Sequence, residues 1–282
     1  MNRVAVVIPC FNDGATLSDA LRSVGEQEAC EIVVVDDGST EASTLELLET
    51  LRADGLAVVR QENRGLAAAR MAGVAATSAR YVQPLDADDL LATGALTALA
   101  DALDAHPDAA AAWGDVAFFG EFELVAPTAE RLDPWTIWYL DEIPGTSMVR
   151  RTVLERTGGW QFDRAYEDWD FWMTLAEQGL TGVRVPRVVL RYRRDPQRMS
   201  AGGLMRHGEL LQALRARHPQ LRRALRRNWR RSAAPLRMRL LFPAIDRLPI
   251  SGWNRHRLRR LVAHPRRVLA HRRIRRRAKQ GS

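Results

Sequence analysis

Residues 81–91 of the chain have the sequence YVQPLDADDLL, in which an apolar run ends in three carboxylates within four residues. Like charges this close repel, so a folded chain keeps them together only beside a cation or in generous solvation. In an extended segment, residues i and i+2 point the same way, so Asp86 and Asp88 can share one ligand. Oxygen ligands suit Mg²⁺ or Mn²⁺, which bind through one or two carboxylates plus substrate phosphates. For this stretch alone, a solvated turn with a helix N-cap is an equally good interpretation.

The first half of the chain alternates short apolar runs with helical patterns. The strand-like runs are Val4–Ile8, Ile32–Val35, Ala57–Arg60 and Tyr81–Pro84, and the helical patterns cover about 15–26, 41–53, 66–77 and 90–105. Such alternation predicts βαβ units and an α/β fold, with a mostly parallel, Rossmann-like sheet flanked by helices. A further apolar run at Ala109–Phe119 is expected to continue the sheet.

Polar clusters follow three of these strands, at Pro9–Asp13, Asp36–Ser39 and Asp86–Asp89. Ligands of parallel sheets bind at the carboxyl ends of the strands. We therefore expect the three clusters to lie along one edge of the sheet, which weakens the turn-only interpretation of each.

The second half is less regular. Residues 120–145, rich in Trp, Pro and acidic residues, are expected to form a loop region over the site. A strand at 147–149, a short helix from Arg151 and a helix at Glu167–Gln178 follow. Pro196, Gly202 and Gly203 place a linker near Asp195–Gly203. The expected division is a catalytic domain at 1–205 and an Arg-rich helical extension at 206–282.

Charge divides the chain sharply. Residues 221–282 hold 21 of the 42 basic residues and one acidic residue, giving +20, so the remainder carries −12. The acidic part is typical of a globular enzyme, and the basic part of an attachment to something anionic. Cys10 and Cys30 lie in apolar surroundings and are expected to be buried, inert thiols. With neither a secretory signal nor an apolar run of membrane-spanning length, the expected location is cytoplasmic, peripheral to the inner face of the cell membrane.

Two further motifs allow both a functional and a structural interpretation. Arg64 and the helix N-terminus that follows it could meet a diphosphate, or simply begin a core helix. Residues 167–170 (EDWD) place three carboxylates around a Trp at a helix start. They are ordinary partners of the helix dipole, or an aromatic sugar platform with a carboxylate that takes a proton from a hydroxyl.

In order along the chain, these motifs resemble those of family 2 glycosyltransferases, inverting enzymes of the GT-A fold. The resemblance rests on residues 4–12 (VAVVIPCFN), 35–39 (VDDGS), 63–65 (NRG), 85–89 (LDADD), 150–151 (RR), 158–160 (GGW) and 167–170 (EDWD). Each piece is weak, but the ordered set is specific and covers roughly residues 3–200.

The resemblance implies a nucleotide-sugar donor, with a UDP-sugar favoured, a Mn²⁺ or Mg²⁺ cofactor, and a carbohydrate or lipid-linked acceptor. Carried over by position, the resemblance implies that Asp168 is the general base and that Asp88 and Asp86 bind the metal. The nucleotide and donor sugar would contact Pro9, Phe11, Asn12, Asp37, Arg64, Asp86 and Asp88. The acceptor would contact Trp160, Glu167 and Trp169.

The chain departs from the family pattern at two places. Met71 stands where members often have Asn, and Asp195 where many have a His that contacts metal or phosphate. Asp195 could ligate a metal, but its carboxylate would repel a diphosphate, so Arg194 or Arg198 could serve the phosphates instead. This contact stays open.

The basic extension begins with arginines at i, i+4 spacing and an apolar line of Leu221, Leu225 and Trp229, a pattern typical of a basic amphipathic helix. Arg with apolar and Trp residues suits an anionic membrane surface, here through residues 221–279, whereas a solvated tail and a nucleic-acid arm are less favoured alternatives.

The expected function is transfer of a sugar to a hydroxyl acceptor in cell-surface polysaccharide or glycolipid synthesis. Two alternatives stay open: a polyprenyl-phosphate sugar synthase using a GDP-, UDP- or dTDP-sugar, and a non-catalytic membrane or nucleic-acid binding protein. The intact carboxylates Asp88 and Asp168 argue against the second. A Rossmann dehydrogenase is excluded because residues 9–14 (PCFNDG) lack its glycine-rich turn.

Overall fold

The computed structural model describes residues 2–194, 206–266 and 268. Its strands are β1 Val4–Cys10, β2 Glu31–Asp36, β3 Ala57–Arg60, β4 Tyr81–Pro84, β5 Leu90–Leu91, β6 Ala109–Gly120, β7 Leu124–Ala126, β8 Met148–Arg150 and β9 Thr181–Arg194. Its helices are α1 Gly14–Gly25, α2 Ala42–Ala53, α3 Leu66–Ala75, α4 Ala95–Ala105, α5 Arg151–Thr157, α6 Glu167–Glu177, α8 His207–Arg217, α9 Pro219–Arg223, α10 Leu225–Arg231, α11 Leu236–Asp246 and α12 Gly252–Ala263. The expected linker at Asp195–Gly203 lies outside the described residues.

One nine-stranded sheet runs through the molecule in the order β3-β2-β1-β4-β8-β6-β9-β5, with β7 paired to β6. Strands β3, β2, β1 and β4 are parallel, as the alternation predicts, and so are β6 and β9. Antiparallel pairs join β8 to β4 and β6, β5 to β9, and β7 to β6. The sheet is therefore mixed, and the carboxyl ends of β1, β2 and β4 meet at one edge.

Strand β1 is the centre of the parallel half. All seven of its residues are buried, which fits an apolar strand covered by helices on both faces. Helix α3 approaches this strand closely at Gly73, where an added Cβ would lie 2.2 Å from Cγ1 of Val7. Only a residue without a side chain permits that approach, so Gly73 allows the second half of α3 to pack directly on β1.

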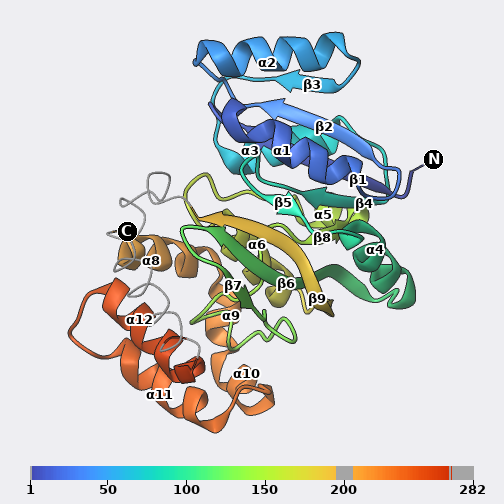
Figure 1. Cartoon of the computed structure of the whole chain (residues 1–282). Coiled ribbons are helices and arrows are strands. Elements are labelled where there is room, and N and C mark those ends of the chain that lie inside the picture. The colour runs from blue at the N-terminus through green and yellow to red at the C-terminus, as the bar shows by residue number, and fades with distance from the viewer. Residues whose placement is uncertain (1, 195–205, 267, 269–282) are drawn as a thin grey trace.

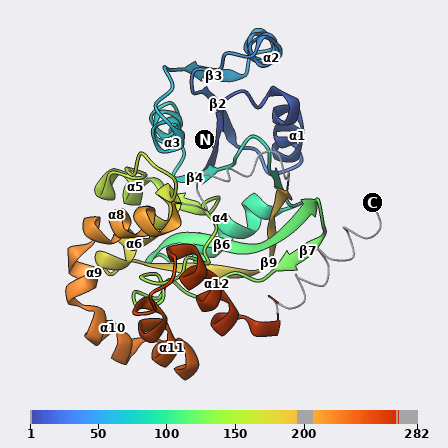
Figure 2. The same ribbon diagram turned by 90° about the vertical axis from the view of Figure 1, so that its left-hand side faces the viewer.

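Two hydrophobic cores lie on opposite faces of the sheet. One holds the apolar faces of α1 and α4. The other holds those of α3 and α6 and continues into the C-terminal helices through Leu214, Leu221 and Phe242. Figures 1 and 2 show α8–α12, in orange to red, gathered at the end of the molecule opposite α2 and β3. The basic extension up to residue 266 is therefore folded against the rest of the chain.

The expected amphipathic helix over residues 221–231 is two short helices, α9 and α10, that meet at Ala224. Its apolar line faces the protein: Leu221 is buried, and Leu225 and Trp229 pack against the core. The segment is helical, as predicted, but it is broken into two helices, and its apolar line packs on the core and is not available to a membrane.

Two other local expectations differ from the structure. The helix expected over 90–105 begins only at Ala95, because Leu90 and Leu91 pair with β9 as a short antiparallel strand. Strand β9 itself has no counterpart among the predicted strands, since its many arginines and Pro186 hide the β pattern. Cys10 is buried as expected, whereas Cys30 is only half-buried.

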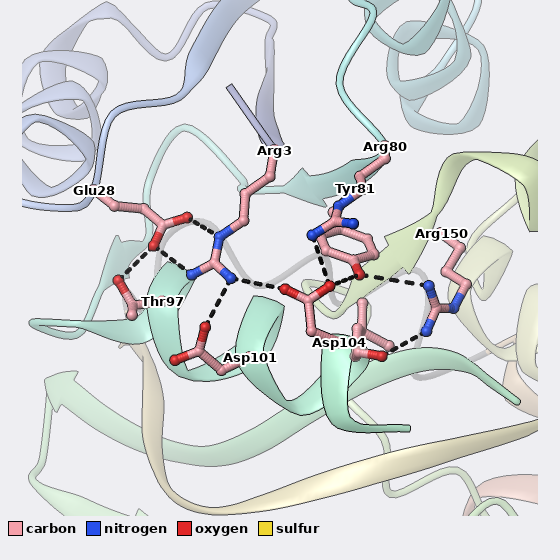
Figure 3. A network of polar contacts seen from close by, with 9 residues as sticks. Arg3, Glu28, Arg80, Tyr81, Thr97, Asp101, Asp104 and Arg150 are labelled. Atoms are coloured by element: carbon pink, nitrogen blue, oxygen red, sulfur yellow. Dashed lines mark hydrogen bonds and ion pairs between the residues drawn. The ribbon is translucent and has the colours of Figure 1, made fainter. Parts of the chain in front are cut away.

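Polar side chains tie together the amino edge of the sheet, away from the strand-end clusters (Figure 3). The Arg3 guanidinium donates to Glu28, Asp101 and Asp104 at 2.7–2.9 Å, and the Tyr81 hydroxyl donates to Asp104 at 2.6 Å. Arg150 lies against the Tyr81 ring and donates to the carbonyls of Leu103, in the last turn of α4, and His106, just after it. Ion pairs and hydrogen bonds therefore brace this edge of the sheet.

Candidate active site

The loop after β1 is locked to the loop after β2 by Asn12. Its side-chain oxygen accepts hydrogen bonds from the Thr40 and Glu41 amides at 2.8 and 3.0 Å, and its own amide donates to the Ser39 hydroxyl at 3.0 Å. Asn12 adopts a left-handed backbone conformation, φ 57°, that Asn tolerates better than most residues. Pro9 is buried at the end of β1, while Phe11 is 45% exposed beside it. An exposed aromatic ring thus stands at the rim where β1 and β2 end.

Asp37 organises the entry to α3. One carboxylate oxygen accepts from the Gln61 side chain at 2.7 Å and the Arg64 amide at 2.9 Å, and the other accepts from the Gly65 amide at 2.9 Å. The side chain is buried, whereas Arg64 is exposed. Asp37 and Arg64 therefore lie together at the edge of the sheet, as their sequence positions predict.

A buried guanidinium joins two of the acidic motifs. Arg70 of α3 is 2% exposed, and it donates to Asp86 after β4 and to Glu167 at the start of α6, at 2.9 Å each. Its ring neighbour is Trp160, with the guanidinium 5.6 Å from the indole centroid. Burial opposes the charge on Arg70, but the carboxylates outweigh it and keep its pKa above the ordinary value. Arg70 thus holds the acidic loop after β4 and the start of α6 at a fixed separation.

Strand β9 braces the acidic loop that follows β4. The Arg193 amide donates to the Asp89 carboxylate at 2.8 Å, and its guanidinium donates to the Asp88 carbonyl at 2.9 Å. Asp89 is buried, and its second oxygen has no hydrogen-bond partner in the part of the chain described. Burial, together with the charges of Asp86 and Asp88, holds the pKa of Asp89 well above its usual range. Three carboxylates are therefore close enough to repel one another.

This acidic loop fits a divalent cation. Within residues 2–194 and 206–266, no three His, Cys, Asp or Glu side chains form a complete protein-only metal site. Mg²⁺ and Mn²⁺ do not require one, because they take their remaining ligands from substrate phosphates and water. The raised pKa of Asp89 indicates that the three carboxylates repel one another, and a cation beside Asp86 and Asp88 would offset this repulsion. The expected contact of Asp195 lies outside the described residues.

Asp168 stands at the start of α6 beside the loop 141–146. Its carboxylate accepts from the Trp169 amide at 2.8 Å, and Gly145 leaves room for it, since a Cβ there would lie 3.0 Å from the Asp168 Cβ. Burial raises the pKa of Asp168, against the opposing charge of Arg70. Asp141 faces it across the loop, and burial together with the charge of Asp168 raises the pKa of Asp141 well above its usual range. Both carboxyl groups therefore hold a proton more tightly than an exposed aspartate does.

A cavity of about 670 Å³ lies between the acidic loop after β4 and the start of α6, whereas Asp37, Arg64 and Asp88 are not among the residues that line it. Its walls include Asp86 from the loop after β4, Asp168 from α6 and Tyr192 from β9. His256 and Arg260 of α12 also line it, so the C-terminal extension forms part of the same cavity. Burial lowers the pKa of His256 to about 3, and its Nδ1 has no hydrogen-bond partner among the described residues. The His256 imidazole is therefore neutral and can exchange a hydrogen bond with a ligand hydroxyl.

The comparison with protein families agrees with this architecture. The family model described as Glycosyl transferase family 2 matches residues 5–158, which is more than half of the chain. This chain belongs to glycosyl transferase family 2.

Curated relatives match this family 2 chain over shorter segments. The succinoglycan biosynthesis protein ExoU of Rhizobium meliloti (strain 1021) is 41% identical over 96 residues, which cover 33% of this chain and 28% of that protein. An N-acetylglucosaminyltransferase of Bradyrhizobium elkanii is 32% identical over 120 residues, covering 40% and 65%. The chain thus spans less than two thirds of the length of either relative.

Solved structures share the whole fold. The Staphylococcus aureus TarS fragment 1-349 in complex with UDP-GlcNAc superposes with a TM-score of 0.60 at 18% identity, covering 94% of this chain and 74% of that one. The mannosyltransferase PcManGT from Pyrobaculum calidifontis in complex with GDP-Man and Mn²⁺ superposes with a TM-score of 0.57 at 23% identity, covering 79% and 69%. The family 2 chain therefore has the GT-A fold.

The structure does not place the two predicted acceptor tryptophans in the cavity of this family 2 chain. Trp160 and Trp169 are each 3% exposed. Trp160 packs on Phe171, and the Trp169 indole nitrogen donates to the Ile137 carbonyl at 2.7 Å. Both rings are buried and neither lines this cavity, so the predicted contact of these tryptophans with an acceptor stays a prediction. Glu167, in contrast, does line the cavity.

Sequence reasoning missed four residues that the structure brings to the site: Arg70, Asp141, His256 and Arg260. A signal existed for Arg70, the one charged residue within the apolar sequence of α3. Asp141 lies in the stretch 120–145, for which the sequence predicts only a loop rich in acidic residues. His256 and Arg260 are hidden among the arginines of the extension, where composition suggests attachment rather than a site.

Proposed function

We propose that the chain is an inverting, metal-dependent glycosyltransferase that moves a sugar from a UDP-sugar to a hydroxyl acceptor of a cell-surface polysaccharide or glycolipid. The observation that carries the proposal is the buried Arg70, which fixes Asp86 and Glu167, and hence the acidic loop and Asp168, around one cavity. A donor and an acceptor bound there would meet at a fixed separation.

The donor is assigned to the edge formed by β1, β2 and β4. Phe11 and Asn12 would flank the base and ribose beside Pro9, Asp37 would fix the nucleoside, and Arg64 is exposed beside the helix start for the diphosphate. UDP is favoured because solved structures of the TarS fold neighbour contain UDP and UDP-GlcNAc. A polysaccharide product is favoured because relatives include ExoU and the poly-beta-1,6-N-acetyl-D-glucosamine synthase of S. aureus.

Asp86 and Asp88 would hold Mn²⁺ or Mg²⁺. When bound, the cation neutralises negative charge on the departing diphosphate. On the acceptor side, Asp168 takes the proton of the attacking hydroxyl while that oxygen bonds to the anomeric carbon. The bond from the anomeric carbon to the diphosphate oxygen breaks on the opposite face, and the diphosphate leaves with the electron pair. This geometry inverts the anomeric configuration.

Binding of the donor nucleotide tests this function directly. UDP is expected to raise the unfolding temperature of the protein only when Mn²⁺ is present, and more than GDP or dTDP does. At a concentration one hundred times its Kd, the nucleotide stabilises the native state by about 2.7 kcal/mol. The measurement is a thermal unfolding series across the three nucleotides, with and without Mn²⁺.

Matched variants make the binding test specific. Asp88→Ala should abolish the UDP and Mn²⁺ response, whereas Asp108→Ala, which removes the same charge from an exposed turn before β6, should keep it. If no nucleotide stabilises the wild type with any divalent metal, the donor site does not work as proposed and the binding-protein alternative gains support.

We also propose that the extension docks on an anionic membrane through α11. Four leucines on α11 and just after it are 41–62% exposed: Leu236, Leu240, Leu241 and Leu248. The exposed Arg237 and Arg247 flank them, so the surface combines apolar area with positive charge. No helix within the described ranges has the length and hydropathy needed to cross a bilayer.

Vesicle co-sedimentation tests the docking. The protein should bind vesicles containing phosphatidylglycerol, and Leu240→Glu combined with Leu241→Glu should weaken binding at least about tenfold, because two leucines lose their burial in the bilayer. Val125→Glu, at an equally exposed valine of β7, is the control that should bind normally. Equal binding by both variants would argue against α11 as the docking surface.

A further inference from the structure

The C-terminal extension encloses a second cavity, separate from the one that holds Asp168. It has a volume of about 500 Å³ and lies between α8, α9 and α12. Four arginines line it, Arg215, Arg222, Arg255 and Arg259, and the only acidic residue in its wall is Asp246. None of the residues assigned to the donor or the acceptor base lies in this wall, so the proposed transfer reaction leaves the cavity unexplained.

Asp246 cannot neutralise this group of arginines. Its carboxylate forms ion pairs with Arg215, at 3.1 Å, and with Arg259, and its backbone carbonyl accepts from Arg255 at 2.9 Å. One negative charge thus faces four guanidinium groups. The Arg222 side chain is exposed at the rim and has neither a hydrogen bond nor an ion pair with the residues described. The cavity therefore carries three uncompensated positive charges.

Two of the guanidinium groups are held in place by the backbone of the 138–139 turn. Arg215 donates to the Trp138 carbonyl at 3.0 and 3.2 Å, and Arg259 donates to the Tyr139 carbonyl at 3.3 Å. Arg259 is 1% exposed, and its Nε has no partner among the described residues. Burial, with the charge of nearby arginines, lowers the pKa of both Arg215 and Arg259 to about 10. Arg259 is thus fixed and buried, and Arg215 is fixed and half-buried, at a cost that a bound anion would relieve.

The chemistry of the wall selects the anion. Guanidinium groups offer paired N–H donors that match the oxygens of phosphate, and fixed guanidinium groups lose little entropy on binding. We infer that this cavity, lined by Arg215, Arg222, Arg255 and Arg259, binds a phosphate group of the acceptor. The assignment of that phosphate to the acceptor rests on the proposed function, whereas the binding of phosphate does not.

Helix α12 connects this cavity to the catalytic one. Arg255 and Arg259 line the arginine cavity, and the adjacent His256 and Arg260 line the cavity that holds Asp168. Residues four apart share one face of a helix, so α12 presents neighbouring faces to the two cavities. An acceptor that carries a phosphate could be held at one face of α12 while its hydroxyl reaches the other.

The first experiment is calorimetric titration of inorganic phosphate into the full chain, in a chelator and at constant ionic strength. The chelator removes the divalent metal that the donor site is proposed to need. Arg222→Gln combined with Arg255→Gln should weaken phosphate binding at least about tenfold, the size expected for lost charge-assisted hydrogen bonds. Arg223→Gln with Arg257→Gln removes the same charge from exposed positions of α9 and α12 and should bind like the wild type.

Failure to bind phosphate, or an equal loss in both double variants, would overturn the phosphate site. Thermal unfolding without phosphate checks that both variants fold. This titration remains valid even if the UDP and Mn²⁺ test fails, so the two proposals can fail separately.

The second experiment identifies the source of the phosphate. In a transfer assay, the Arg222→Gln and Arg255→Gln double variant should raise KM at least about tenfold for an acceptor that carries a phosphate, with kcat unchanged. For the same acceptor after a phosphatase has removed its phosphate, the double variant and the wild type should have the same KM. If phosphate binds but neither KM responds, the cavity takes free phosphate and its assignment to the acceptor is wrong.

Discussion

Replacing Asp168 by Asn is expected to lower kcat for sugar transfer about 10³-fold, within the range that a positioned general base contributes. The amide fills the same space at the start of α6 but cannot accept the hydroxyl proton. Because Asp168 is assigned to the acceptor, UDP binding with Mn²⁺ should be unchanged. Asp163→Asn, at a side chain that is 83% exposed a few residues earlier, should retain full activity.

The dependence of kcat/KM on pH distinguishes loss of the general base from distortion of the site in Asp168→Asn. Burial raises the pKa of Asp168, so its carboxylate becomes protonated at a higher pH than the value of ~3.9 typical of exposed aspartates. As the pH is lowered, the wild-type kcat/KM should therefore begin to fall while the pH is still above that value. The residual activity of Asp168→Asn should not show this fall. An Asp168→Asn enzyme with more than a tenth of wild-type kcat would identify another residue as the base.

Replacing Arg70 by Met is expected to destabilise the native state by about 3–5 kcal/mol, the usual consequence of removing one partner from a buried ion pair. The methionine fills much of the space but leaves Asp86 and Glu167 without their shared cation. Chemical denaturation without nucleotide measures the free energy of unfolding. Arg64→Met, at the exposed arginine just before α3, should change it by less than about 0.5 kcal/mol.

Charge repulsion as the cause can be checked in two ways. Burial and the charge of Asp168 raise the pKa of Glu167 to about 7. Since Glu167 becomes neutral below that value, the destabilisation by Arg70→Met should shrink as the pH falls. Adding Glu167→Gln to Arg70→Met should also restore part of the stability. A loss that is the same at every pH and unaffected by the second change would indicate a packing defect instead.

Local sequence patterns were sufficient for the parallel half of the fold. Strands β3 and β4 have the predicted bounds, and β1 and β2 differ from them by at most two residues. These strands are short apolar runs bounded by turns, so their pattern is local. The prediction failed where pairing overrides the pattern: Leu90 and Leu91 join β9, and β9 keeps its arginines on a strand because β6 pairs along its length.

Predictions of the site show the same division. Asp37, Asp86 and Asp88 follow strands that the sequence identifies, and parallel strands must end at a common edge. The burial of Trp160 and Trp169 could not be predicted, because a Trp beside a helix end has the same sequence pattern whether it faces a ligand or the core. Only the packing of α6 on the loop around Ile137 decides that Trp169 is buried.

The sequence by itself determined the alternation of strands and helices as far as β4, the acidic strand ends and the family membership suggested by their ordered motifs, because each depends on neighbours in the chain. The tertiary structure alone decided that Arg70 joins Asp86 to Glu167, 97 positions from Arg70, and that Asp141 faces Asp168. It also decided that the basic extension packs on α6 and lines the catalytic cavity with His256 and Arg260. Those contacts join segments whose separation along the chain carries no periodic signal, so only the packed core brings them together.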